Sequence, residues 1–294
     1  MRALALMAGG MFMFAAADAQ AKFLSQTLSS LQIVWSRQLG LFIGVIVLLF
    51  MHGLPVLHTA HPKLQILRGA LAAGSATLFV MAVRYVPLAD AVAVSFVAPF
   101  VVTVFGALLL HEHVGIRRWL AVAAGFIGML IVIRPGLGVI HPAAFLVAIA
   151  ASLFAFRQIL SRHLAATDRT STTGAYTAIV AIVVLTVPLP FVWQTPQTTI
   201  EIVVLVGLSV SAAFGEFLII KSLEIGQAVV VAPVQYTMLL WGTVYGFLVF
   251  GQLPDEWTWV GALIIVTTGL YTLHRERLAS RKAAKIRSAP PEAG

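Results

Sequence analysis

Charged side chains are rare in this sequence, and several of them interrupt long apolar runs. Of the 294 residues, 60% are hydrophobic and only 10% are charged. A charge near the middle of a membrane helix is costly unless it is paired or faces a wet cavity. Such charges are therefore the first candidates for coupling or gating, and they are Asp18, Arg37, Arg157 and Glu216.

Each of these charges has a structural alternative. Asp18 and Lys22 lie four residues apart, so they can pair on one face of a helix near the outer membrane surface; the other interpretation of Asp18 is a proton site. Arg37 can extend to the membrane surface or contact a neighbouring helix.

The other two charges lie near the ends of their predicted helices. Arg157 could bind a substrate carboxylate, although the nearby helix end favours extension of its guanidinium to the surface. Glu216 is predicted about one and a half turns inside a helix end. It could couple transport to protons if burial raised its pKa toward neutrality, or it could reach loop water. Both interpretations of Glu216 remain open.

Uncharged polar and aromatic residues suit a neutral or zwitterionic substrate. Pro99 and Pro233 each remove a backbone hydrogen bond inside an apolar run, which permits a hinge. Broken helices in corresponding positions of two halves indicate a midplane site, although membrane prolines often only kink a helix. The predicted substrate-binding residues are Tyr85, Ser95, Pro99, Gln235, Tyr236, Thr237, Trp241 and Tyr245.

Signatures of enzymes, metals and cofactors are missing. The chain has no cysteine, which excludes disulfides and thiolate-bound metals. The cluster His111-Glu112-His113 has no third ligand at a spacing that suits zinc. No glycine-rich phosphate loop is present. We therefore expect a protein that is not an enzyme and has no cofactor.

Long apolar runs predict an all-α membrane protein with ten transmembrane helices. The predicted spans are about 3–22, 31–51, 64–83, 90–110, 117–133, 142–161, 174–193, 201–220, 227–250 and 257–273. Arg68 and Arg157 interrupt two of them. The first span also resembles a secretory signal ending in Ala17-Asp18-Ala19, but its removal would leave nine spans.

The distribution of lysine and arginine predicts the orientation. With ten spans, fifteen of these residues fall on the side of both termini and four on the other side. The positive-inside rule then places both termini in the cytoplasm. Residues 275–294 are predicted to be a disordered basic cytoplasmic tail that anchors the chain at membrane lipid, with no role in nucleic-acid binding.

An internal repeat predicts two five-helix halves, 1–134 and 135–274. The stretch from Arg84 to Val94 resembles the stretch from Lys221 to Val231; chance similarity between apolar helices is the alternative. A repeat of five helices enters the membrane twice with opposite orientation. Inverted repeats are characteristic of secondary transporters.

The order of several motifs resembles the EamA-type drug/metabolite transporter superfamily. The motifs are Asp18–Lys22, Trp35–Arg37, Leu110–Glu112, Ala232–Thr237, Leu239–Gly242 and Phe250–Asp255. The resemblance covers residues 4–274 and implies ten helices as two inverted repeats. It also implies a structural or gating contact for Arg37, which matches the arginine that the family usually has there. One departure is Gln252, which stands where the family usually has glutamate; its first-half counterpart Glu112 is intact. Within the superfamily the chain is most similar to YddG-type amino-acid exporters.

This resemblance implies a secondary transporter of the bacterial-type inner membrane that works by alternating access. The expected substrates are small neutral or aromatic amino acids or related metabolites, and export is the expected direction. One alternative is a membrane-embedded enzyme acting on lipid or isoprenoid substrates. Others are a transporter of another metabolite class, such as a nucleotide sugar or drug, and a passive channel.

Overall fold

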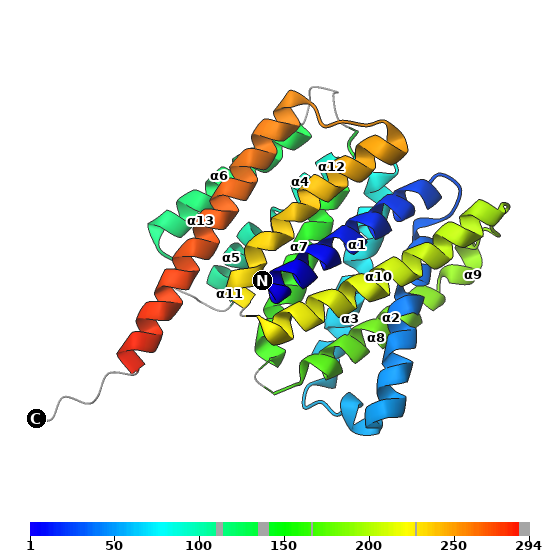
Figure 1. Cartoon of the computed structure of the whole chain (residues 1–294), viewed down its shortest axis with the longest axis horizontal. Helices are drawn as coiled ribbons and strands as arrows, with labels where there is room; N and C mark the ends of the chain where they lie inside the picture. The colour runs from blue at the N-terminus through cyan, green and yellow to red at the C-terminus, as the bar shows by residue number, and fades with distance from the viewer. Residues whose placement is uncertain (110–113, 135–140, 166, 227, 288–294) are drawn as a thin grey trace, which may run out of the picture.

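The protein folds into a bundle of helices (Figure 1), and its structure is a computed structural model that describes residues 1–109, 114–134, 141–165, 167–226 and 228–287. Within these residues there is no strand. The α-helices are α1 (Arg2–Leu24), α2 (Ser30–His52), α3 (Pro62–Val83), α4 (Leu88–Ser95), α5 (Ala98–Leu109), α6 (Ile116–Ile133), α7 (Ala144–Leu164), α8 (Thr170–Thr186), α9 (Leu189–Val192), α10 (Thr199–Ile225), α11 (Ala228–Val231), α12 (Thr237–Phe250) and α13 (Glu256–Arg287). Two 3₁₀ helices, η1 (Leu54–Leu57) and η2 (Ala232–Tyr236), complete the chain order.

Seven helices in the described part of the chain are long and apolar enough to cross a membrane. They are α1, α2, α3, the pair α4 and α5 taken together, α6, α7 and α10. The apolar helix α8 has 17 residues and is shorter. The remaining two predicted spans fall on α11 to α12 and on α13. All ten predicted spans thus coincide with helical segments, and the number of helices that cross the membrane stays a prediction.

The helix α1 lies inside the bundle and packs against α10 and α12. Met7, Ala15 and Leu24 of this helix are fully buried. Gly10 of α1 lies against the backbone of Gly215 in α10, so the two helices approach closely. Small residues allow such close packing in membranes, where lipid is as apolar as the side chains it would replace.

The other helices extend the bundle on both sides of this pair. The helix α3 packs against α7 and α8, while α2 packs against α8 and α10. The helix α4 packs against α7 and α12, and α5 also packs against α7. At one edge of the bundle α6 and α13 lie side by side (Figure 1).

The two predicted proline breaks are confirmed. Helix α4 ends at Ser95 and α5 begins at Ala98, directly before Pro99. In the corresponding later segment, α11 changes into the 3₁₀ helix η2, which contains Pro233, before α12 begins. Proline cannot donate the hydrogen bond that would continue each helix.

The prediction of a disordered tail is wrong for residues 275–287, because α13 continues as a helix to Arg287. These residues are rich in Ala, Lys and Arg, which are strong helix formers. Positive charge indicated disorder, but helix propensity decided the conformation. Residues 288–294 lie outside the described residues.

Candidate functional site

Three charged residues from three helices form what we call the interior charge cluster: Arg68 of α3, Arg157 of α7 and Glu216 of α10. Electrostatic interaction links Glu216 to both guanidinium groups, and the two arginines to each other. All three residues are partly buried. Among the described residues no direct ion pair joins Glu216 to either arginine.

Arg68 is held firmly by its neighbours. Its Nε donates to the Ser161 hydroxyl of α7 at 2.7 Å. One terminal nitrogen donates to the carbonyl of Thr173 at 3.3 Å and to the hydroxyl of Thr177 on α8. Arg68 therefore joins α3 to α7 and α8 and holds a fixed position from which it can act on Arg157 and Glu216.

Arg157 is less completely bonded. Its guanidinium carbon lies 4.6 Å from the centre of the Phe154 ring, and its Nε is buried and has no hydrogen-bond partner among the described residues. The prediction that Arg157 extends to the membrane surface is wrong, because α7 continues to Leu164 and the side chain packs on an aromatic ring instead. A buried N–H without a partner is an open donor for a ligand.

Glu216 lies farther from the end of its helix than the sequence suggested. Helix α10 continues to Ile225, which places Glu216 about two and a half turns before the helix end. The sequence indicated one and a half turns, because apolar character ends before the helix does. The partial burial of Glu216 and its interaction with two arginines favour an interior role for this carboxylate.

Three aromatic residues form a second group, the aromatic cluster: Phe12 of α1 with Trp241 and Tyr245 of α12. The Phe12 ring lies edge-on to Trp241 with 5.0 Å between centroids, and 5.6 Å from Tyr245. The Trp241 Nε1 is buried, and no residue in the described part of the chain accepts a hydrogen bond from it. This cluster combines ring surface with one open donor.

The two clusters lie at a similar depth in the bundle. Gly10 of α1 contacts Gly215 of α10. Phe12 follows Gly10 by two residues, and Glu216 is adjacent to Gly215. The contact between these helices therefore brings the aromatic and charged groups to one level near the middle of α1.

The other predicted residues around the two prolines serve local structure. The Tyr236 ring lies 4.8 Å from that of Phe96, and its hydroxyl packs against Gly269 of α13. The hydroxyls of Ser95 and Thr237 donate to carbonyls of their own segments, Ala91 and Val234. The side chains of Pro99 and Gln235 are exposed.

Tyr85 is not placed with the aromatic cluster. It follows α3 in a turn and is 54% exposed. Its ring stacks on His141 with 4.6 Å between centroids and a 12° interplanar angle. Tyr85 therefore lies near the fourth span, as the sequence placed it, but in the turn between α3 and α4 rather than inside a helix.

The predicted pair of Asp18 with Lys22 is wrong. Asp18 instead forms an ion pair with Arg37 of α2, with 2.9 Å between Oδ1 and the terminal nitrogen. Lys22 points toward the turn before α4, and its Nζ donates to the carbonyl of Val86 at 2.6 Å. The packing of α2 against α1 places Arg37, and not Lys22, within ion-pair distance of Asp18. Of the two predicted roles for Arg37, contact with a neighbouring helix is confirmed.

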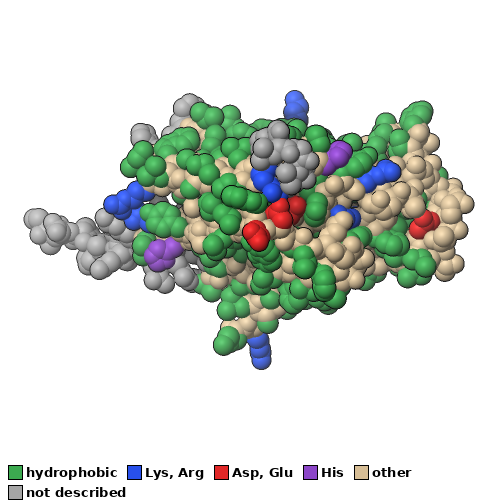
Figure 2. Space-filling view, turned by 90° about the horizontal axis from the view of Figure 1, so that it is seen from above, with side chains coloured by type: hydrophobic (Ala, Val, Ile, Leu, Met, Phe, Trp, Pro, Cys, Tyr) green, Lys and Arg blue, Asp and Glu red, His purple; other side chains and the backbone are tan. Residues whose placement is uncertain are grey.

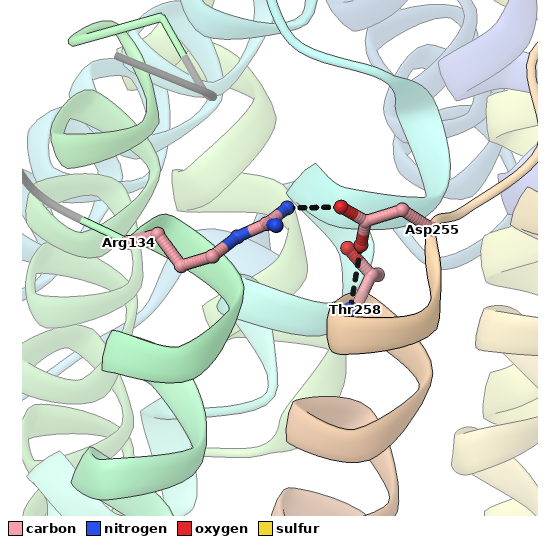
Figure 3. Close-up of polar contacts among 3 residues, drawn as sticks. All are labelled: Arg134, Asp255 and Thr258. Carbon is pink, nitrogen blue, oxygen red and sulfur yellow. Dashed lines mark hydrogen bonds and ion pairs between the residues drawn. The ribbon is translucent and has the colours of Figure 1, made fainter. Parts of the chain in front are cut away.

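Several further polar groups gather where α6 ends and α13 begins, and Figure 3 shows three of them, Arg134, Asp255 and Thr258. Arg134 pairs with Asp255, whose other oxygen accepts from the backbone N–H of Thr258 at 2.8 Å. Arg134 itself has a left-handed backbone, with φ at 44°. Asp90 interacts electrostatically with both Lys22 and Arg134. We call Lys22, Asp90, Arg134 and Asp255 the end cluster.

Sequence reasoning missed two members of the interior groups. Arg68 was noted only as an interruption of an apolar run, although it satisfies the same rule that selected Arg157. Phe12 lies on an apolar helix without periodicity, so nothing in the sequence separates it from ordinary packing residues. The part of the chain that the structure describes holds no group of three metal-ligating side chains, and Glu112 with His111 and His113 lies outside it.

The exterior of the bundle suits a lipid environment. Figure 2 shows a face on which hydrophobic side chains predominate and charged ones are few. Large apolar residues such as Leu120, Val203 and Leu263 are more than 60% exposed. A soluble protein rarely exposes so much continuous apolar surface.

Comparison with known proteins agrees with this picture. The chain matches the EamA-like transporter family over residues 1–134 and 141–273. It is similar to an S-adenosylmethionine uptake transporter of Rickettsia felis, at 28% identity over 90% of each chain. A riboflavin transporter of Vibrio cholerae is 30% identical over 76% of this chain and 75% of its own length. A pseudopaline exporter of Pseudomonas aeruginosa is 26% identical over 87% of this chain and 90% of its own length.

A solved crystal structure of another protein supports the same fold. It superposes with a TM-score of 0.63 at 16% identity, covering 94% of this chain and 98% of its own. The family match extends over both segments and almost the whole bundle. With its membrane-spanning helices and bacterial transporter relatives, this chain belongs to the EamA-like transporter family and is a multi-pass transporter of the inner membrane.

Proposed function

We propose that the protein is a secondary transporter that works by alternating access between two five-helix halves, 1–134 and 135–274. The helix contacts support this organisation because they come in matching pairs. The contact of α1 with α10 corresponds to that of α3 with α7 when the first five spans exchange with the last five. By the same exchange, α1 with α12 corresponds to α5 with α7. Such pseudo-symmetry lets two halves exchange conformations.

The substrate that best fits the interior is a zwitterion with an aromatic ring. The open Nε of Arg157 suits a carboxylate, and Glu216 suits an ammonium group because no direct ion pair within the described residues occupies it. The aromatic cluster offers a stacking surface and the free Trp241 N–H. The single observation that carries the proposal is the buried, unpartnered Arg157 Nε beside Glu216.

Two kinds of metabolite meet this description. An aromatic amino acid is the smaller kind, as expected from the sequence. S-adenosylmethionine, which the name of the Rickettsia relative specifies, is the larger kind, since it joins an amino-acid group to an adenine ring. Riboflavin has the ring without the zwitterion. We therefore place zwitterionic substrates before neutral ones.

The direction of transport is a separate proposal. The resemblance to amino-acid exporters led us to expect export. The named relatives include an uptake transporter and an exporter, so both directions occur within the family. Export by this chain stays a prediction.

The test is substrate exchange in liposomes that contain the purified protein. Radiolabelled S-adenosylmethionine, tryptophan and riboflavin are measured separately for saturable counterflow. We expect counterflow with at least one zwitterion and a large loss in Glu216→Gln. The matched control is Glu224→Gln, on the same helix, where the carboxylate is 54% exposed and pairs with Lys221.

Three results would contradict the proposal. Transport of riboflavin alone would remove the zwitterion requirement, and the absence of saturation with any substrate would indicate a channel. Equal activity of the two glutamate variants would remove Glu216 from substrate binding. An imposed proton gradient then tests coupling: a wild-type response that persists unchanged in Glu216→Gln would exclude this carboxylate as the coupling group.

A further inference from the structure

A groove at the edge of the bundle combines a basic end with an apolar continuation. Helices α6 and α13 run antiparallel there (Figure 1), and Gly128 lies against the backbone of Gly261. This close contact holds the two helices together in one half of their length. Toward the first turn of α6, residues of both helices line two adjoining open hollows of about 400 Å³ and 360 Å³.

The basic end of the groove is lined by arginines from both helices. Arg117 and Arg118 come from the first turn of α6 and Arg275 from α13, with Tyr271 and Thr272 between them. Arg118 is anchored, since its Nε donates to the Thr103 hydroxyl at 3.2 Å. Within the described residues, Arg117 and Arg275 have no hydrogen-bond or ion-pair partner.

The first turn of α6 adds backbone donors to this end. Its N-cap residue is Gly115, which has no side chain to accept from the first N–H groups. Within the residues that the structure describes, the N–H groups of Ile116 and Arg117 have no acceptor, and they lie at the positive end of the helix dipole. Two unpaired guanidinium groups and a helix N-terminus in one hollow are suited to an anion such as phosphate.

The second hollow continues from the first and is apolar. It shares Arg117 and Tyr271 with the basic end and is otherwise lined by Leu120, Ala121, Ala124 and Thr268. The two alanines make the depression because they leave space between larger residues. A ligand that fills both hollows needs an anionic head and a hydrocarbon chain.

The surroundings of the groove indicate the source of such a ligand. Leu120 of α6 is 63% exposed and Leu263 of α13 is 64% exposed, so both helices present apolar side chains outward. In an inner-membrane protein this surface contacts the acyl chains of the bilayer. A free soluble anion would reach the basic end but would leave the apolar hollow empty.

We propose that the groove between α6 and α13 binds an anionic phospholipid. The phosphate contacts Arg117 and Arg275, and one acyl chain lies along Leu120, Ala121 and Ala124. Basic hollows between membrane helices recognise anionic headgroups in this way, through charge rather than shape. The proposal does not depend on the identity of the transported substrate.

The test compares lipid binding to the full-length protein by native mass spectrometry. Protein in neutral detergent is titrated with phosphatidylglycerol, with phosphatidylcholine and with inorganic phosphate. The double variant Arg117→Gln/Arg275→Gln should bind phosphatidylglycerol about tenfold more weakly than wild type. The control Lys63→Gln/Arg169→Gln removes two exposed cations elsewhere and should bind like wild type.

A further variant tests the apolar hollow. Ala124→Phe should weaken binding of long-chain phosphatidylglycerol and leave a short-chain form unaffected, since only the acyl chain meets the new ring. Thermal unfolding of each variant checks that the fold is retained. Equal phosphatidylglycerol binding by the double variant and its control would overturn the proposal. The proposal would also be overturned if wild type bound phosphatidylcholine as well as phosphatidylglycerol, or if inorganic phosphate displaced phosphatidylglycerol at the same concentration.

Discussion

The interior charge cluster and the Asp18–Arg37 pair both place charges inside the bundle, but they satisfy them differently. Asp18 is 3% exposed and forms a direct ion pair with Arg37, whose guanidinium also lies 5.4 Å from the Phe14 ring. Arg157 and Glu216 interact without a direct ion pair, and the Arg157 Nε is unpartnered. The charges of Asp18 and Arg37 thus satisfy each other, whereas Arg157 and Glu216 can still bind a ligand.

This difference separates structural charges from functional ones. Removing one partner of a buried ion pair strongly destabilises the folded protein, because the other charge remains in the interior without a partner. Neutralising a charge that already lacks a direct partner costs the protein little stability. Such a charge is nevertheless the one that can bind a ligand. Stability and transport measurements on the two regions should therefore give opposite results.

The largest expected effect on stability is at Asp18. Asp18→Ala should lower the free energy of unfolding by about 3 kcal/mol, because it leaves the Arg37 charge unpaired in the interior. The measurement is thermal unfolding of the protein in detergent. The double variant Asp18→Ala/Arg37→Leu should recover part of the lost stability. If its loss in the free energy of unfolding equalled the sum of the losses in the two single variants, a pairwise interaction would be contradicted.

The next effect concerns transport rather than stability. Arg157→Gln should reduce substrate exchange about thirtyfold, equivalent to about 2 kcal/mol, because the proposed carboxylate contact is removed. Its unfolding stability should change by less than about 1 kcal/mol, since no direct hydrogen bond of the Nε is lost. A variant that unfolds as readily as Asp18→Ala would show that Arg157 is a structural charge after all.

A smaller effect is expected at Lys22, which joins α1 to the turn before α4. Lys22→Met removes the hydrogen bond to the Val86 carbonyl, so this end of the bundle should open more often. The chain has no cysteine, so Ala89→Cys, at a position only 2% exposed, provides a clean probe. A membrane-impermeant maleimide should label it about tenfold faster in the Lys22→Met background. Equal labelling rates would exclude a closing role for Lys22.

The smallest effect is expected at Arg134, because the side chain of its partner Asp255 is 43% exposed. Arg134→Gln should cost less than about 1 kcal/mol of stability, and less still in high salt. Loss of hydration opposes ionisation of Asp255, but the Thr258 N–H and Arg134 outweigh it and hold the pKa of the carboxyl below its usual 3.8.

The sign of the pH dependence follows from this lowered pKa. The contribution of the pair is present above the usual carboxyl pKa of 3.8 and is lost as pH falls through the lowered value. The difference in unfolding temperature between wild type and Arg134→Gln should therefore be visible at about pH 7 and shrink progressively in acid. A difference that grows on acidification would contradict the assignment.

Local features of the fold could be predicted from the sequence, and long-range pairings could not. Pro99 and Pro233 break their helices because the missing N–H acts within one turn. The partner of Asp18 depends on where α2 packs, and a single sequence does not contain that information. Lys22 was the nearest cation along the helix, but Arg37 is the nearest in space.

The sequence predicted which kinds of residue form the candidate site, but not which of them come together. The rule on intramembrane charge selected Arg157 and Glu216, and it applies equally to Arg68. Trp241 and Tyr245 were expected from their place after Pro233, and both meet Phe12. Tyr236 was expected with them, but it lies in the 3₁₀ segment η2 and packs against Gly269 of α13.

The packing of the bundle has a consequence for how the protein can be made. The contacts of α1 with α10, of α3 with α7 and of α6 with α13 all connect residues 1–134 to residues 141–273, the two segments that match the family. Arg134, the last residue of the first segment, also pairs across to Asp255. The peptide link between the segments therefore adds little to a large shared interface. Two separately translated polypeptides, expressed together in one cell, should assemble into a working split transporter.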